Sequence, residues 1–304
     1  MTARGRGLAL VALTACTSVA TAHAEAPSTA PEANPSPGVS IAGKRSAKVS
    51  YGRPVRVSGM APGGGGRVVK LHYAPNGGAF AEVASTTTAA DGSYRFRPTA
   101  RRSGAYRAVS DGVASSTQKR VTVVGSLKAR TTRHALAGGV VRARGRLLPA
   151  VRGRTIKLQL RRGRGWRTVD TTRTGRGGRF SAAWRPSGPG RHRLRVRFAG
   201  DRVAAAAGER VRANIYRAGH ASWYGPGLYG NSLGCGGTLR PSTLGVAHKT
   251  LPCGTRVTFR HRGRSVTARV VDRGPYISGR EWDLTEALKR KLGFGSTGTV
   301  WTTR

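Results

Sequence analysis

The stretch "RVVKLHYAPNGGAFAEV" (residues 67–83) returns further along the chain as "RTIKLQLRRGRGWRTV" (residues 154–169). Lys70 of the first copy corresponds to Lys157 of the second and Phe80 to Trp166, at offsets of 87 and 86 residues. Apolar and polar residues alternate in both copies, and this is the period of a β-strand with one buried face. The repeat therefore predicts two related units built from strands.

Turn signals repeat together with the strands. "DGSY" (residues 91–94) and "GGRF" (residues 177–180) occupy corresponding places, and each is typical of a hairpin turn. Repeat units of this length, with short strands and no helical period, predict two tandem immunoglobulin-like β-sandwiches. We expect these modules to span residues 39–125 and 126–216.

The composition is strongly basic. Lys and Arg together number 54 against 12 Asp and Glu, which gives a formal net charge of +42 over 304 residues. Such a charge favours anionic partners, whose attraction weakens as the salt concentration rises. In "RPSGPGRHRLRVR" (residues 185–197) arginine occupies alternate strand positions, which favours a face for polyanions. A merely solvated basic surface, produced by coding bias, is an equally good interpretation.

The N-terminus has the pattern of an export signal. An Arg-bearing start precedes the short apolar run "LALVALTA", and cleavage after Ala24 would remove a signal peptide of residues 1–24. Alternatively "LTAC" resembles a lipobox, in which Cys16 would carry a lipid anchor. Residues 25–38 are rich in Pro, Ala and Ser and predict an extended linker. No segment has the roughly 20 apolar residues of a transmembrane span, so we expect a secreted, cell-wall or lipid-anchored protein.

The remaining cysteines, Cys235 and Cys253, form an even pair in an exported chain, which predicts a disulfide. The closed loop contains fewer than 20 residues, a constraint that contributes about 3 kcal/mol. We expect no metal or cofactor, because no CxxC or His-x-x-His spacing accompanies the pair. A Cys-His catalyst with His248 is disfavoured by oxidation outside the cell.

After residue 216 the composition shifts towards Gly, Thr and aromatic residues. Alternation predicts strands at residues 221–224, 255–260, 265–271 and 298–302. A helix is expected to begin at Asp283, which forms a D-x-x-E capping box with Glu286, and to stop at Gly293.

Four motifs in this region carry a resemblance. "ASWYGPGLYG", "GVAHKTLPCGTRV", "VVDRGPY" and "WDLTEA" resemble, in order and spacing, the rare lipoprotein A (RlpA)-like double-psi β-barrel family, and more distantly expansins and family 45 glycoside hydrolases. The resemblance covers residues 217–304. It implies a six-stranded barrel with a short helix, an extracytoplasmic location and a polysaccharide ligand, most often peptidoglycan. The whole chain is thus expected to be mainly β: two sandwiches followed by this barrel.

The resemblance also implies a chemistry. In RlpA-like lytic transglycosylases a carboxylic acid protonates the glycosidic oxygen, and the 6-hydroxyl of the sugar closes a 1,6-anhydro product. Asp283 matches the acid of expansin-like barrels, with Asp272 and His248 as assisting residues. Structural alternatives remain: Asp283 as a helix cap and His248 as a loop pin. Moreover Arg273 and Arg280 are expected to lower the pKa of neighbouring carboxyl groups.

One departure from the family favours a second function. No Asp or Glu occurs in residues 225–271, where catalytic RlpA-type sequences carry an acidic stretch. A two-carboxylate mechanism must therefore use Asp272 and Asp283 alone. The alternative is a non-catalytic peptidoglycan-binding module, or one that loosens the wall as expansins do.

Aromatic side chains stack on sugar rings while charged side chains bind hydroxyls. The expected substrate-binding residues are Trp223, Tyr224, Tyr229, Tyr276, Trp282 and Arg273. Tyr276 and Trp282 are expected to be accessible, whereas Trp223 also fits a core position. The expected partners are peptidoglycan and anionic wall polymers. Nucleic acid is not expected, because the chain has an export signal and lacks a recognition helix.

Overall fold

The computed structural model describes residues 38–304. The expected export signal, Cys16 and the linker up to residue 37 lie outside the described residues. Within residues 38–304, no helix combines the length and apolar character needed to cross a membrane.

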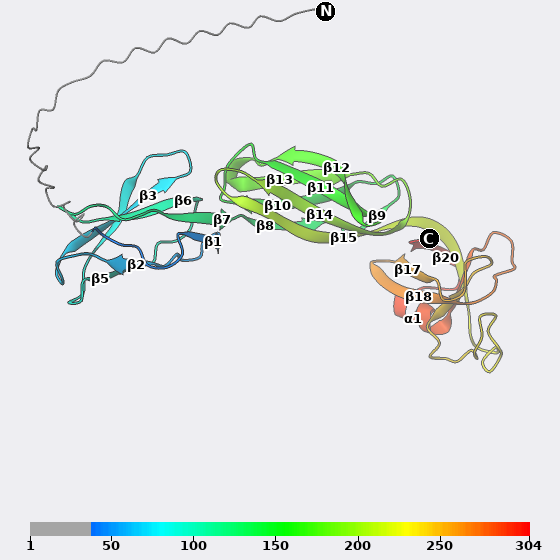
Figure 1. Cartoon of the computed structure of the whole chain (residues 1–304). Helices are drawn as coiled ribbons and strands as arrows, with labels where there is room; N and C mark the ends of the chain where they lie inside the picture. Colours follow the sequence, from blue (N-terminus) through cyan, green and yellow to red (C-terminus); the bar gives the residue numbers. More distant parts are fainter. Residues whose placement is uncertain (1–37) are drawn as a thin grey trace, which may run out of the picture. The chain divides into compact units, whose positions relative to one another are not determined.

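The first repeat unit is a β-sandwich (Figure 1). One sheet has the order β1-β7-β6-β3-β4, and the second consists of β2 and β5. Apolar side chains from both sheets, among them Val57, Leu71 and Tyr106, are buried in one cluster. The strands of the first sandwich are β1 (Ser46–Ser50), β2 (Val57–Met60), β3 (Val68–Pro75), β4 (Ala81–Thr87), β5 (Ser93–Phe96), β6 (Gly104–Val109) and β7 (Lys119–Val124).

The second repeat unit is also a sandwich. The sheet β9-β15-β14-β11-β12 and the sheet β13-β10-β8 enclose a core that includes Leu147, Leu158 and Val196. A short 3-10 turn, Arg176–Gly178, precedes β13. The strands of the second sandwich are β8 (Ser126–Thr131), β9 (His134–Leu136), β10 (Val141–Leu148), β11 (Thr155–Arg162), β12 (Gly165–Arg173), β13 (Arg179–Trp184), β14 (Gly190–Gly200) and β15 (Ala205–Tyr224).

The last strand of this sandwich continues into the C-terminal region. β15 pairs with β14 over its first part and with β19 and β20 over residues 217–224. The order β15-β20-β17-β18-β16-β19 returns to β15, so six strands close a ring, as expected for a barrel. The other five strands are β16 (Gly245–Ala247), β17 (Arg256–His261), β18 (Arg264–Asp272), β19 (Trp282–Thr285) and β20 (Gly298–Thr302).

One helix, α1 (Glu286–Leu292), packs its buried Leu288 and Leu292 on the barrel core. Its N-cap is Thr285, so the expected capping box at Asp283 is wrong. Asp283 lies in β19 because its backbone pairs with β15 and β16, and this pairing requires an extended conformation. The expected stop is confirmed: Gly293 adopts a left-handed φ of 63° after the last turn.

Candidate functional site

The two candidate acids lie on one face of the barrel sheet. Ser222 of β15 pairs with Asp283 of β19, which pairs with Ala247 of β16, which in turn pairs with Asp272 of β18. Directly paired residues point to the same face of a sheet. Asp272 and Asp283 are two strand spacings apart, about 10 Å at Cα. The ladder thus aligns both carboxyl groups across the closed ring.

Asp283 is half-buried, and the Ser222 hydroxyl donates a hydrogen bond to its Oδ1 at 2.8 Å. Burial raises the pKa of Asp283, and the negative charge of Asp272 adds to the rise. The Ser222 hydrogen bond and Arg280 act in the opposite direction, but the net shift is upward. Arg280 lowers this pKa, as expected of a nearby arginine, but desolvation outweighs its charge.

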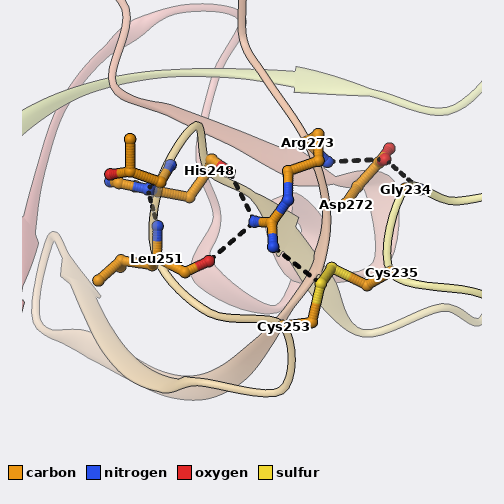
Figure 2. The surroundings of a disulfide bond; sticks show 8 residues. Gly234, Cys235, His248, Leu251, Cys253, Asp272 and Arg273 are labelled. Carbon is orange, nitrogen blue, oxygen red and sulfur yellow. Dashed lines mark hydrogen bonds between the residues drawn. A yellow bond between two sulfur atoms is a disulfide. The ribbon is translucent and has the colours of Figure 1, made fainter.

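Asp272 ties a long loop to the barrel. Its Oδ1 accepts hydrogen bonds from the backbone N–H groups of Gly234, at 2.7 Å, and Arg273, at 2.8 Å (Figure 2). A Cβ at Gly234 would lie 2.9 Å from Arg273 Cγ and 3.1 Å from Asp272 Oδ1. Glycine at this position therefore allows the loop to approach the carboxylate.

The predicted disulfide between Cys235 and Cys253 is confirmed. Beside it, Arg273 Nη1 donates to the carbonyl oxygens of His248 and Leu251, and Nη2 contacts Cys253 Sγ at 2.9 Å (Figure 2). Arg273 was expected to bind substrate. The structure instead directs its guanidinium into the loop of residues 248–253, because three carbonyl or sulfur acceptors converge there.

His248 pins the same loop. Its Nδ1 accepts hydrogen bonds from the backbone N–H groups of Thr250, at 3.1 Å, and Leu251, at 3.0 Å. Its Nε2 lies 3.8 Å from Oε1 of Glu281, and its ring packs on Trp282 with centroids 4.5 Å apart. Burial lowers the pKa of His248, which favours the neutral ring. Because Nδ1 accepts hydrogen bonds, the proton of the neutral ring lies on Nε2.

No hydrogen bond joins the side chains of His248 and Asp272 in the part of the chain that the structure describes. Only backbone atoms join the two: the amide of His248 donates to the carbonyl of Asp272 at 3.2 Å. The ring turns instead to Trp282, which precedes Asp283 in β19 and points to the other face. Alternation along the strands therefore separates His248 from the two acids.

The predicted aromatic residues differ in their exposure and in their contacts. Tyr276 is 82% exposed, as expected, whereas the expectation for Trp282 is wrong, because it is fully buried in the barrel core. Tyr224 lies two residues beyond Ser222 on the face of the acids; burial, Asp272 and Asp283 all raise the pKa of its buried hydroxyl.

The remaining two aromatic residues already have partners within the domain. The Trp223 ring is covered by Lys289, whose Nζ lies 3.3 Å from the ring centroid. The Tyr229 hydroxyl donates to Glu286. Neither ring is free in the way that Tyr276 is.

Sequence reasoning missed three residues around the site. Ser222 meets Asp283 only through the parallel pairing of β15 with β19, which joins positions 61 residues apart. Glu281 forms a two-pronged ion pair with Arg217 and lies beside His248. The charge of Glu281 was visible in the sequence, but its partners depend on ring closure.

Residues 216–302 match the protein family described as "Lytic transglycolase", and these residues contain the whole set of barrel strand pairings. The domain is an RlpA-like double-psi β-barrel.

Curated relatives agree with the match. The probable endolytic peptidoglycan transglycosylase RlpA of Synechocystis sp. is 42% identical over 97 residues, covering 31% of this chain and 29% of the relative. The endolytic peptidoglycan transglycosylase RlpA of Pseudomonas aeruginosa strain UCBPP-PA14 is 46% identical over 91 residues, covering 29% and 27%. The chain thus spans less than a third of the length of these relatives, and the similarity concerns the RlpA-like barrel.

Among solved structures, the tetra-tandem repeat in the extending region of a large adhesion protein aligns with this chain. The alignment covers 80% of this chain and 66% of the adhesion-protein chain. The sequence identity is 14% and the TM-score 0.35.

Proposed function

We propose that the RlpA-like barrel cleaves peptidoglycan glycan strands as a lytic transglycosylase. The observation that supports this most is the paired placement of Asp283 and Asp272 on one face, with the pKa of Asp283 raised by burial. A carboxyl group that retains its proton at higher pH is suited to act as a general acid. The names of the relatives give the substrate class.

In the proposed reaction Asp283 donates its proton to the glycosidic oxygen as the C1–O bond breaks. Positive charge develops on the sugar ring, and the carboxylate of Asp272 stabilises it electrostatically. The 6-hydroxyl of the same sugar then bonds to C1 and returns its proton to Asp283, which restores the acid and leaves a 1,6-anhydro end. Tyr276 supplies an exposed ring for stacking.

The proposal places the protein outside the cytoplasm, as the export pattern of residues 1–24 predicts. Two modes of export fit the proposal. Either a lipid on Cys16 anchors the protein to the membrane, or cleavage after Ala24 releases it. Besides peptidoglycan, the excess of basic residues favours anionic wall polymers as partners.

A non-catalytic wall-binding or wall-loosening module is the second candidate. It is favoured by the lack of acids in residues 225–271 and by the engagement of Asp272 Oδ1 with the disulfide loop. Under this alternative the barrel, with the exposed ring of Tyr276, would bind glycan without breaking it.

Muropeptide analysis separates the two candidates. Purified wild-type protein should release 1,6-anhydro muropeptides from peptidoglycan, and Asp283→Asn should lower the release at least 100-fold, since general acid catalysis contributes factors of about 10² to 10⁴. Glu82→Gln, which removes an exposed carboxylate of the first sandwich, is the control and should match the wild type. Glycan binding by the wild type without any anhydro product would support the second candidate.

A further inference from the structure

The second sandwich has an outer face that is rich in cations. On β14 the exposed or half-exposed Arg193, Arg195 and Arg197 alternate with buried Leu194 and Val196. Neighbouring strands add more cations to the same face. The arginine face consists of Lys157, Arg161, Arg193, Arg195, Arg197, Arg210 and Arg212.

Like charges stand directly opposite each other on this face. Arg193 pairs with Arg212 across the β14–β15 ladder, and Arg195 pairs with Arg210. Like charges in directly opposed positions destabilise a sheet. Among residues 38–304, the ion pairs involve none of the seven side chains. The face therefore concentrates positive charge, and a bound anion would reduce the repulsion between its cations.

Part of the face is held in place. Arg195 Nε donates to Gln159 Oε1 at 2.7 Å, and its guanidinium lies 4.4 Å from the centroid of Trp166. Arg161 lies over the same ring at 5.4 Å. Burial, followed by the charges of Arg197, Arg161 and Arg210, lowers the pKa of Arg195. The Arg195 side chain is thus held in one orientation, with other positive charges close to it.

The first sandwich provides an internal comparison. Its Arg107 lies 4.3 Å from the ring centroid of Phe80, so the contact between an arginine and this aromatic position belongs to both copies. Its Lys70, however, pairs with Asp111 at 3.5 Å, whereas the corresponding Lys157 has no such partner. At this position the charge is therefore paired in the first copy and unpaired in the second.

We propose that the arginine face binds a linear polyol-phosphate polymer of the cell wall. Guanidinium groups pair with phosphate through two parallel hydrogen bonds, and all but one of the seven cations are arginines. Along β14 the arginines recur at every second residue, about 7 Å apart, which suits a polymer with regularly repeated charges. That the polymer belongs to the wall rests on the proposed function of the barrel.

The same geometry disfavours nucleic acid. Proteins that bind single strands stack bases on free aromatic rings. On this face Trp166 is the aromatic side chain, and two guanidinium groups already lie over it. A polymer without bases fits the surface better.

The experiment measures binding of the full chain to poly(glycerol phosphate) at several salt concentrations. The double variant Arg193→Gln/Arg212→Gln is compared with Arg142→Gln/Arg144→Gln, which removes two exposed arginines from β10 in the other sheet. The first variant should weaken binding, and its plot of log affinity against log salt should flatten by about 1.4, taking 0.7 per lost contact. The β10 variant should retain the wild-type slope, and both should keep the wild-type circular dichroism.

Three results would overturn the proposal: equal losses in both double variants, tighter binding to single-stranded DNA or to anionic lipid vesicles than to the polymer, or no binding at physiological salt. Asp283→Asn should bind the polymer as the wild type does. This result separates the arginine face from the barrel, because a barrel without turnover would leave polymer binding intact.

Discussion

At the scale of single residues, the site depends on which face each side chain occupies. Asp283 and its neighbour Trp282 alternate in β19, so one enters the site and the other the core. The sequence identified Asp283 and Asp272 as candidates through their motifs. It could not show that Trp282 is buried or that Ser222 bonds Asp283, because both depend on pairings between distant strands.

Two substitutions of His248 distinguish a structural role of this side chain from a role in the reaction. An asparagine side chain can accept hydrogen bonds from the backbone two and three residues ahead, as Nδ1 of His248 does. We therefore expect His248→Asn to retain most of the stability and activity, and His248→Ala to lose about 2 kcal/mol in the free energy of unfolding. Chemical denaturation and muropeptide release measure the two effects. A stable but inactive asparagine variant would show that the ring takes part in the reaction.

The pH dependence of the same residue follows from its lowered pKa. The folded state disfavours the protonated ring, so the contribution of His248 to stability is fully present above about pH 6.5 and is lost as pH falls through the folded-state pKa. Between pH 7 and 5 the wild type should lose more unfolding free energy than His248→Asn. Parallel curves for the two proteins would contradict the assignment.

At the scale of elements, long alternating runs were predictable and short strands were not. The ends of β17 and β18 lie within one residue of the expected ranges, β20 matches its expected range, and the Gly293 stop is correct. β16 and β19 have only three and four residues, too few for a period to emerge. The misplaced capping box has the same origin, since the sequence before α1 satisfies a capping pattern while the backbone belongs to β19.

The disulfide loop is the element that supports Asp272. Cys235 and Cys253 are 18 positions apart, and Gly234, next to Cys235, donates to Asp272. Replacing both cysteines by serine should lower the unfolding free energy by about 3 kcal/mol through the freed loop entropy. Denaturant titration of wild-type and variant proteins measures this difference. An unchanged midpoint would show that the loop is held by Arg273 and Asp272 without the covalent link.

At the scale of the whole molecule, charge dominates. The chain carries +42, and the described residues contain few ion pairs to offset it. The repeat and the barrel motifs were sufficient to predict two sandwiches and a six-stranded ring. Which part of the charge forms a surface could not be predicted, because the arginine face depends on the register of three strands, β11, β14 and β15.

Salt should therefore have opposite effects on stability and on binding. Raising the NaCl concentration from 50 to 500 mM should increase the thermal midpoint, since screening weakens the self-repulsion of the folded chain, and should weaken binding to anionic polymers. Thermal unfolding followed by circular dichroism tests the first effect. A midpoint that falls with salt would mean that ion pairs stabilise the fold more than repulsion destabilises it.

The central claim is that the barrel shelters a carboxyl group able to hold a proton beside a glycan. Carbon-13 NMR of the aspartate carboxyl groups in the full chain, with Asp283→Asn used to assign the signal, measures this directly. The structure predicts that Asp283 titrates clearly above the usual value of about 3.9. Titration at or below that value would show that Asp283 is an ordinary ionised group, and the proposed acid catalyst would have no proton to give.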